Sequence, residues 1–256
     1  MRPILRKLRT LLSIDPKWAY RFLRKRAVHQ LTFKWSRLIG RKYWDADVVG
    51  VPLRFTFFAP YHHRIAYFYH TGLFERSALS VWKDQAKEAN VIYDIGGFSG
   101  IYGLLAAKVN PNARILIFEP DVINAEHIHK NIKANGLSNC EVDEAAVSDV
   151  PGTARFSQGG SSGERLSEWG REVRVETLDD LPPANLIKID VEGAEAKVIA
   201  GGKHALQKKP KIMLEIHPWG LSEADQEQMW STLRGLGYQW KQVADDTEGS
   251  PHYLVS

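Results

Sequence analysis

The sequence is poor in cysteine and has no long apolar run, and both absences limit what it can be. Its one cysteine, Cys140, excludes an internal disulfide framework and is typical of a protein from a reducing compartment. No apolar run reaches the ~18 residues that a membrane-spanning helix needs. The opening residues, MRPILRKLRTLLSI, lack the apolar stretch and cleavage site of a secretory signal. The sequence therefore predicts an intracellular, cytoplasmic protein.

Positive charge is concentrated at the start of the chain. Residues 1–45 hold 13 Lys and Arg against two Asp, a net charge of +11; because the whole chain carries +4, the remainder carries −7. Leucines at near-helical spacing and several aromatic residues accompany this charge. Such a basic, amphipathic helical extension is typical of segments that lie on an anionic membrane, here the inner face, or that bind phosphate groups. The alternative is a helical extension that docks on its own chain. Nucleic acid ranks below both, because no nucleic-acid motif accompanies the charge.

Residues 46–89 form a second, small region, which we expect to cap the substrate side. The stretch VVGVPLRFTFFA alternates in the manner of one or two strands, and the later part of the region is predicted to be helical. Tyr61, His62 and Arg64 are candidates to line the substrate entrance. The adjacent His62 and His63 do not predict a metal site, because no acidic or cysteine partner stands at ligand spacing.

Residues 90–256 alternate between strand and helix signals. The expected strands lie at 91–92, 113–119, 140–147, 184–190 and 211–217. The expected helices lie at 101–108, 121–136, 194–206 and 222–237. Two further pairs of strands are expected, one at 153–158 and 172–178 and one closing the chain at 238–243 and 252–256. This pattern predicts an α/β fold with a doubly wound, mostly parallel, Rossmann-like sheet, whose ligands bind at the carboxyl ends of the strands.

A glycine-rich turn follows the first of these strands. In NVIYDIGGFSG, Asp94 ends the strand, and Gly96, Gly97 and Gly100 lie in the turn, where backbone can approach a ligand closely. The spacing does not fit the G-x-G-x-x-G of a dinucleotide site, and an acid beside the turn would repel a pyrophosphate. S-adenosylmethionine has a cationic methionine end and no phosphate. Glu119, at the end of the next strand, suits its ribose hydroxyls. The residues therefore favour S-adenosylmethionine over a dinucleotide.

Six motifs, in order, resemble those of the FkbM-type S-adenosylmethionine-dependent methyltransferases. They are IYDIGGFSGIY, FEPDVINAEHIHKNIKANG, AAVSDVPGTARF, ETLDDL, LIKIDVEGAEAKVIAGG and MLEIH, and the resemblance covers about residues 72–217. It implies a methyltransferase domain that methylates a hydroxyl on a glycan, glycolipid or polyketide-like acceptor, which could be lipid-linked or phosphate-bearing. It also implies that Asp94, Gly96 and Gly100 bind the methionine part and Glu119 the ribose.

The resemblance further implies that Asp190 and Glu192 face the transferred methyl group. A sugar hydroxyl is a poor nucleophile at neutral pH, so a base should assist it. His217, which ends the fifth strand, is the first candidate; Asp190 is the second, and Glu192 is a candidate to orient either group. Two plainer interpretations remain open, a buried, hydrogen-bonded His217 and helix capping by Glu192 and Glu195. Metal-assisted transfer by Asp190, Glu192 and His217 together stays open, but their spacing matches no established metal motif, so no metal site is predicted.

Phe98 and Ser99 complete the predicted cofactor turn, and Phe98 departs from the family's pattern. The family usually has Asn at this position, and Asn tolerates a left-handed backbone better than Phe does. Phe98 is therefore expected to reshape the turn, cover the cofactor or fill part of its space. Two functions remain open: an O-methyltransferase, and a catalytically silent methyltransferase-fold module that binds a membrane or partner through its basic extension. Measuring S-adenosylmethionine binding would separate them.

Overall fold

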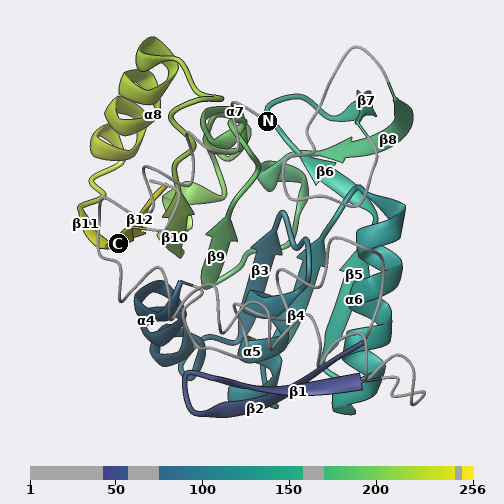
Figure 1. Ribbon diagram of the computed structural model, residues 1–256. Helices are drawn as coiled ribbons and strands as arrows, with labels where there is room; N and C mark the ends of the chain where they lie inside the picture. Colours follow the sequence, from purple (N-terminus) through teal and green to yellow (C-terminus); the bar gives the residue numbers. More distant parts are fainter. Residues whose placement is uncertain (1–42, 57–74, 158–169, 246–249) are drawn as a thin grey trace, which may run out of the picture.

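The computed structural model of the protein describes residues 43–56, 75–157, 170–245 and 250–256 (Figure 1). Seven strands form the main sheet, in the order β11 (Trp240–Asp245), β12 (Pro251–Val255), β10 (Lys211–Glu215), β9 (Leu186–Ile189), β3 (Val91–Ile95), β4 (Arg114–Phe118) and β5 (Cys140–Asp143). The strands from β10 to β5 are parallel, and β12 is antiparallel to both of its neighbours. The predicted α/β, doubly wound, mostly parallel fold is confirmed.

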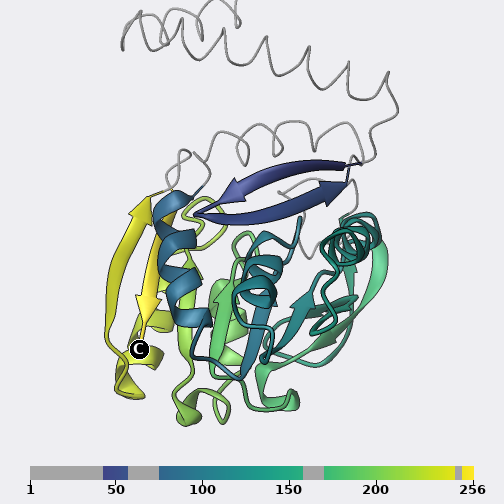
Figure 2. The ribbon, with the colours of Figure 1, turned by 90° about the horizontal axis from the view of Figure 1, so that it is seen from below.

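Helices cover both faces of this sheet (Figures 1 and 2). They are α4 (Arg76–Ala86), α5 (Ile101–Val109), α6 (Val122–Asn135), α7 (Glu195–Ala200) and α8 (Glu223–Gly235), with short 3-10 turns at Leu178–Asp180 and Leu206–Lys208. One hydrophobic core joins α4 and α5 to the sheet, and a second joins α7 and α8 to it. Within the described ranges, no helix combines the length and apolar character needed to cross a bilayer.

Local sequence signals explain where these helices begin and end. Asp121 caps α6 by accepting hydrogen bonds from two backbone amides of the first turn, and Gly136 ends the helix with a φ of 64°. Ser222 caps α8 in the predicted way. The helix expected over 194–206 is shorter than predicted: because two glycines follow Ala200, α7 ends there and a separate 3-10 turn completes the segment.

The two-residue alternation of the central strands sorts apolar from polar side chains. Ile187 and Ile189 of β9 belong to the core beneath α7 and α8, so Lys188 between them faces α4 and α5. In β10, Leu214 belongs to the same core as the two isoleucines, and Glu215 faces α4 and α5 with Lys188. The same alternation puts five more residues on the face of the sheet toward α4 and α5: Asp94, Glu119, Asp190, His217 and His252. One face of the sheet therefore carries nearly all of its buried charge.

The site predicted from sequence lies where the sheet changes direction. From β3 the chain builds β4 and β5 on one side, and it returns to add β9 on the other side, so β3 and β9 are neighbours. Ligands of doubly wound sheets bind at this switch point. Here the turn after β3 meets the end of β9 so closely that a Cβ atom on Gly96, whose φ is +84°, would lie 1.7 Å from the carbonyl oxygen of Asp190. Only glycine fits this contact.

A β-hairpin precedes the main sheet. Its strands are β1 (Tyr43–Val48) and β2 (Val51–Thr56), which agrees with the strand pattern read from VVGVPLRFTFFA. Leu53 and Phe55 are buried in the core that contains α4 and α5, and β2 packs against α5 and α6 (Figure 2). Because β1 begins at Tyr43, the last residues of segment 1–45 are strand and not helix. The rest of the basic extension lies outside the described residues, and the division into 1–45, 46–89 and 90–256 stays a prediction.

A small three-stranded sheet stands beside the main one. It consists of β6 (Ala145–Val147), β8 (Arg171–Glu176) and β7 (Gly152–Phe156), with β7 and β8 forming the expected antiparallel pair. The prediction of one strand over 140–147 is wrong. The chain breaks at Glu144, because β5 pairs with β4 whereas β6 leaves the main sheet to pair with β8.

Replacing Gly96 tests the contact between the turn and β9. Gly96→Ala should lower the free energy of unfolding by ~2 kcal/mol or more, because the new methyl group overlaps the Asp190 carbonyl and the backbone must leave its left-handed conformation. Gly235→Ala is the matched control, since a Cβ there meets no atom within 4 Å and should leave stability unchanged or raise it by up to ~1 kcal/mol. Urea unfolding measures both variants. Equal stability of the two would contradict the close contact.

Candidate active site

The glycine turn after β3 is anchored on the neighbouring strand β4. The backbone amides of Gly96 and Gly97 both donate to the carbonyl of Phe118, each at 3.0 Å. A Cβ on Gly97 would lie 2.2 Å from the Ile117 side chain, so this glycine lets the turn lie flat on β4. Within the predicted cofactor turn, Gly97, Ser99 and Gly100 are buried, and only Gly96 and Phe98 are partly exposed. These two residues are therefore the part of the turn that a ligand can reach.

Glu119 follows β4 and faces this turn. Its Oε2 accepts a hydrogen bond from the backbone amide of Phe98 at 2.6 Å, and its Oε1 accepts one from the amide of Asp121 at 2.9 Å. Burial raises the pKa of Glu119 to about 7, although the two backbone hydrogen bonds lower it. A carboxylate has about four acceptor positions, so it can accept the two hydroxyls of a ribose beside its bonds to the protein.

Asp94, the last polar residue of β3, is buried beneath α5. Its Oδ2 accepts a hydrogen bond from the amide of Gly103 at 2.8 Å, which ties the strand to the first turn of the helix. Burial raises its pKa to about 7, and the Gly103 amide and the Lys188 ammonium oppose the rise. Asp94 and Glu119 thus flank the glycine turn from two adjacent strands. This donor set, two carboxylates beside a close-packed turn, fits the ribose and the cationic end of S-adenosylmethionine.

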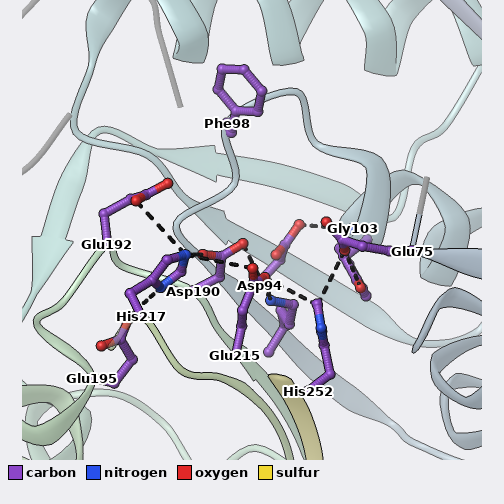
Figure 3. Close-up of polar contacts among 12 residues, drawn as sticks. Glu75, Asp94, Phe98, Gly103, Asp190, Glu192, Glu195, Glu215, His217 and His252 are labelled. Atoms are coloured by element: carbon purple, nitrogen blue, oxygen red, sulfur yellow. Dashed lines mark hydrogen bonds and ion pairs between the residues drawn. The ribbon is translucent and has the colours of Figure 1, made fainter. Parts of the chain in front are cut away.

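Phe98 has the left-handed backbone that its position in the turn requires. Its φ is 47°, which costs a non-glycine residue of order 1–3 kcal/mol. Its amide nevertheless reaches Glu119, so the turn forms with Phe at this position. Figure 3 shows the ring directed away from the acidic residues at the ends of β3 and β9.

The three catalytic candidates lie together beyond the ends of β9 and β10 (Figure 3). The Nε2 atom of His217 is 3.8 Å from Oδ1 of Asp190 and 3.7 Å from Oε2 of Glu192. Burial and the neighbouring Glu215 raise the pKa of Asp190, and burial raises that of Glu192 to about 7. We call Asp190, Glu192 and His217 the carboxylate–histidine cluster.

A further carboxylate, that of Glu195, holds the imidazole of His217. Its Nδ1 lies 2.8 Å from Oε1 of Glu195, an oxygen that also accepts the amide of Gly193. Burial lowers the pKa of His217, but Glu195 and the nearby carboxylates outweigh burial and raise it to about 9. His217 is therefore both buried and hydrogen-bonded, and its pKa lies above the neutral range expected from sequence. In the absence of ligands it is protonated at neutral pH.

Backbone contacts fix the cluster's geometry. Glu192 has a left-handed backbone with a φ of 52°, and Gly193 follows it with a φ of +99°. A Cβ on Gly193 would lie 2.6 Å from the Cα of Gly220 in the turn after His217. The loop after β9 and the turn after β10 therefore pack backbone to backbone, which sets the distance between Glu192 and His217.

A second buried network adjoins the cluster, and the sequence analysis missed its members. Lys188, fully buried, places its ammonium 3.3 Å from Oδ2 of Asp190 and 3.2 Å from Oε2 of Glu215. His252 Nε2 lies 3.1 Å from the same Glu215 oxygen and 3.3 Å from Glu75. The hydroxyl of Tyr102 donates to Glu75 at 2.6 Å. Lys188 and Glu215 could have been found, because K-I-D and E-I-H put them two residues before Asp190 and His217 on the same face.

The structure describes only part of the side on which the acceptor is expected to bind. Tyr61, His62 and Arg64, the predicted substrate residues, lie outside the described residues. Trp219 stands at the cluster instead, 57% exposed, with its ring edge-to-face against His217 at 5.0 Å between centroids. An exposed indole beside polar groups is a suitable surface for a sugar ring.

A family model and named relatives match parts of this chain. Residues 91–240 match the family described as "Methyltransferase FkbM domain". The chain is 27% identical over 161 residues to the hexuronic acid methyltransferase AglP of Haloferax volcanii, which is 56% of this chain and 62% of that protein. It is 33% identical over 153 residues to the 2-O-methyltransferase NoeI of Sinorhizobium fredii, which is 49% of this chain and 62% of that one. The matched part thus spans less than two thirds of each relative.

Among solved structures, the chain is similar to the methyltransferase FkbM from Methylobacillus flagellatus, with a TM-score of 0.49 and 19% identity over 65% of this chain and 43% of that one. The family match itself extends over more than half of the chain, from the first residue of β3 to the first residue of β11. It includes the glycine turn, Glu119 and the carboxylate–histidine cluster. On that match, the protein belongs to the FkbM methyltransferase family.

Proposed function

We propose that this protein is an S-adenosylmethionine-dependent O-methyltransferase that acts on a hydroxyl of a sugar-containing acceptor. The observation that carries the proposal is a row of carboxylates at the ends of neighbouring strands around the switch point. Asp94 and Glu119 flank the glycine turn, and Asp190 comes directly after β9. S-adenosylmethionine is the methyl donor of the family. The names of the two relatives, a hexuronic acid methyltransferase and a 2-O-methyltransferase, support a sugar hydroxyl as the acceptor.

The residues divide the work between holding the cofactor and preparing the acceptor. Bound S-adenosylmethionine supplies a methyl group activated by its positive sulfur. Glu119 binds the ribose hydroxyls, and the partly exposed backbone at Gly96 and Phe98 lies against the cofactor. The buried Asp94 ties β3 to α5 and places a negative charge beside the turn for the cationic end of the cofactor. Alignment of the two reactants supplies much of the rate enhancement in such a displacement.

The carboxylate–histidine cluster prepares the acceptor hydroxyl. The oxygen attacks the methyl carbon as the carbon–sulfur bond breaks, S-adenosylhomocysteine leaves, and the hydroxyl proton passes to the carboxylate of Asp190 or Glu192, because His217 already carries a proton. Asp190 and Glu192 orient the hydroxyl as hydrogen-bond acceptors, because their side chains are partly exposed, 27% and 21%. Glu195 holds His217 in place.

Replacing His217 tests the activity. His217→Gln should lower kcat by about 10²–10⁴-fold, because its imidazolium positions the carboxylates of Asp190 and Glu192, which take the hydroxyl proton. Cofactor affinity should change by less than about threefold, because Asp94 and Glu119 are untouched. The exposed His204 gives the control variant His204→Gln, expected to retain full activity. Transfer of labelled methyl groups to a panel of neutral, amino and acidic glycosides measures the rate. A protein that binds the cofactor yet methylates no hydroxyl in the panel would contradict the proposal.

The raised pKa of Glu119 predicts pH-dependent cofactor binding. The ionised carboxylate accepts both ribose hydroxyls and the protonated form does not, so affinity should fall by up to about tenfold from pH 8 to pH 6, through the pKa of about 7. Binding at pH 6 should also release a proton. Calorimetry in two buffers with different ionisation enthalpies measures both effects.

Glu119→Gln is the matched variant for this measurement. It should bind more weakly at pH 8, by roughly 1.5–3 kcal/mol, and show a shallower pH dependence, since the carboxylate at the ribose that titrates near 7 is then gone. Parent-like affinity and pH profile in this variant would show that Glu119 does not bind the ribose.

The second candidate function is a catalytically silent module, and the observation behind it is that Phe98 departs from the family's pattern. The left-handed turn forms despite the phenylalanine, with its amide on Glu119 and its ring directed away from the acids (Figure 3). This arrangement favours the enzyme over the silent module.

We also propose that the basic residues at the start of the chain bring the protein to an anionic membrane. Deleting residues 1–40 should abolish co-sedimentation with anionic vesicles and leave cofactor affinity unchanged, because each basic residue near the surface contributes roughly 1 kcal/mol. Zwitterionic vesicles and high salt are the controls, and both should weaken binding by the intact chain. If instead the intact chain does not co-sediment with anionic vesicles and the shortened chain melts at a lower temperature, these residues dock on their own chain.

A further inference from the structure

We propose that the carboxylate–histidine cluster of Asp190, Glu192 and His217 is a binding site for one divalent cation of the Mn²⁺ or Mg²⁺ type. The inference rests on the proposed function for its role, because the site lies where the acceptor hydroxyl is expected. It can be tested without any methyl transfer.

Distances within the cluster are close to those that a bound metal would set. One ligand atom from each of the three residues lies within 4.8 Å of the others. The Nε2 of His217 is 3.8 Å from Asp190 and 3.7 Å from Glu192. Ligands bound at ~2.1 Å stand roughly 3 Å apart around a metal. Side-chain movements of less than about an ångström would therefore close the cluster around an ion.

The imidazole already has the orientation of a metal ligand. Its Nδ1 is held at 2.8 Å by Glu195, so in the neutral ring the proton sits on Nδ1 and the lone pair of Nε2 points into the cluster. The His217 side chain is only 4% exposed, yet Nε2 makes no hydrogen bond within the described part of the chain; its nearest carboxylate, Glu215, is at 3.5 Å. A ring nitrogen that faces three carboxylates, each at 3.5 Å or more, leaves room for a ligand between them.

Charge supports the same conclusion. Asp190, Glu192, Glu195 and Glu215 surround His217. The ammonium of Lys188 pairs with Asp190 and Glu215, and His252 lies 3.1 Å from Glu215, so Glu192 and Glu195 have His217 as their positive neighbour among the ion pairs of the described residues. Buried carboxylates in excess of their counter-charges are costly. A divalent cation would balance them and would let His217 be neutral.

The neighbouring acidic group makes a useful contrast. Glu75, Glu215 and His252 also lie within ligand distance of one another. The ring nitrogens of His252 in this group are buried without a hydrogen bond. However, Lys188 already pairs with Glu215 and Tyr102 donates to Glu75, and all three side chains are at most 8% exposed, so an ion has no open path to them. The carboxylate–histidine cluster has partly exposed carboxylates through which an ion can enter and an acceptor hydroxyl can bind.

The donor set indicates the kind of ion. Two carboxylates and one imidazole, with no thiolate, suit a hard or borderline divalent ion, and open positions would remain for hydroxyls of the acceptor. A cation at this place lowers the pKa of a bound hydroxyl and so makes it a better nucleophile. Vicinal hydroxyls of a sugar would be the natural pair of ligands.

Titrating the chelator-treated full chain with Mn²⁺ tests the site without cofactor or acceptor. Calorimetry and the electron paramagnetic resonance signal of free Mn²⁺ should show one ion bound per chain. Asp190→Asn and Glu192→Gln should each weaken binding by about 10–100-fold or more. Glu75→Gln, in the neighbouring group, is the matched control and should bind as the parent does. Thermal melting establishes that each variant is folded. Because the side chain of Glu192 is partly exposed, Glu192→Gln is the variant expected to disturb folding least.

Two results would overturn the inference. One is a folded parent that binds no Mn²⁺, in which case the imidazolium of His217 itself balances the carboxylates. The other is binding that survives Asp190→Asn and Glu192→Gln but is lost in Glu75→Gln. Neither result bears on cofactor binding: a protein that binds the cofactor and transfers methyl groups equally well with a chelator would retain the proposed function and lose the metal. A protein that binds Mn²⁺ and methylates nothing would show the reverse.

Discussion

The buried ammonium of Lys188 is the interaction on which the polar half of this structure depends. It has no exposed surface, and it pairs with Asp190 and Glu215 at 3.3 and 3.2 Å while lying 4.8 Å from the centre of the Tyr102 ring. The carboxylates raise its pKa although burial lowers it, and in return it holds the pKa of Glu215 below the usual value. A neutral side chain at this position would remove the positive charge that Asp190 and Glu215 share and would leave them only His217 and His252 as positive neighbours.

The alternation of the strands explains why these charges meet. Lys188 and Asp190 lie two residues apart in and beyond β9, and Glu215 and His217 do so in and beyond β10, so all four face α4 and α5. The register then places Asp94 opposite Lys188 and His252 opposite Glu215. Two close backbone contacts, Gly96 against Asp190 and Gly193 against Gly220, complete the alignment. The chemistry of the site is therefore set by sheet register and by glycines more than by loops.

Much of the fold was predictable because its signals are local. Apolar runs, capping residues and the glycine turn identify the parallel strands and the helices, and the left-handed conformation at Phe98 follows from its place in the turn. The break at Glu144 was not predictable in this way, because it depends on which strand each half of segment 140–147 pairs with. Pairing partners far along the chain leave no local mark in the sequence.

The candidate site was predictable to the extent that its residues end strands. Asp94, Glu119, Asp190 and His217 were found by that rule alone. Glu75 and His252 could not be found so, because one precedes a helix and the other lies in an antiparallel strand near the end of the chain, and only the folded sheet brings them to Glu215.

The arrangement of charge also separates the two halves of the site. Glu119 and Asp94 each have a pKa of about 7 and are shielded by backbone amides, so they can accept hydrogen bonds or a cationic group without a permanent partner. Around His217 the carboxylates are more numerous and lie closer together, and Lys188 balances only part of their charge. A singly positive cofactor on one side and a divalent ion on the other would each meet the charge that the protein leaves uncompensated. Stability alone would favour apolar side chains at such buried positions, so the acidic character of the sheet's polar face favours a binding role for it.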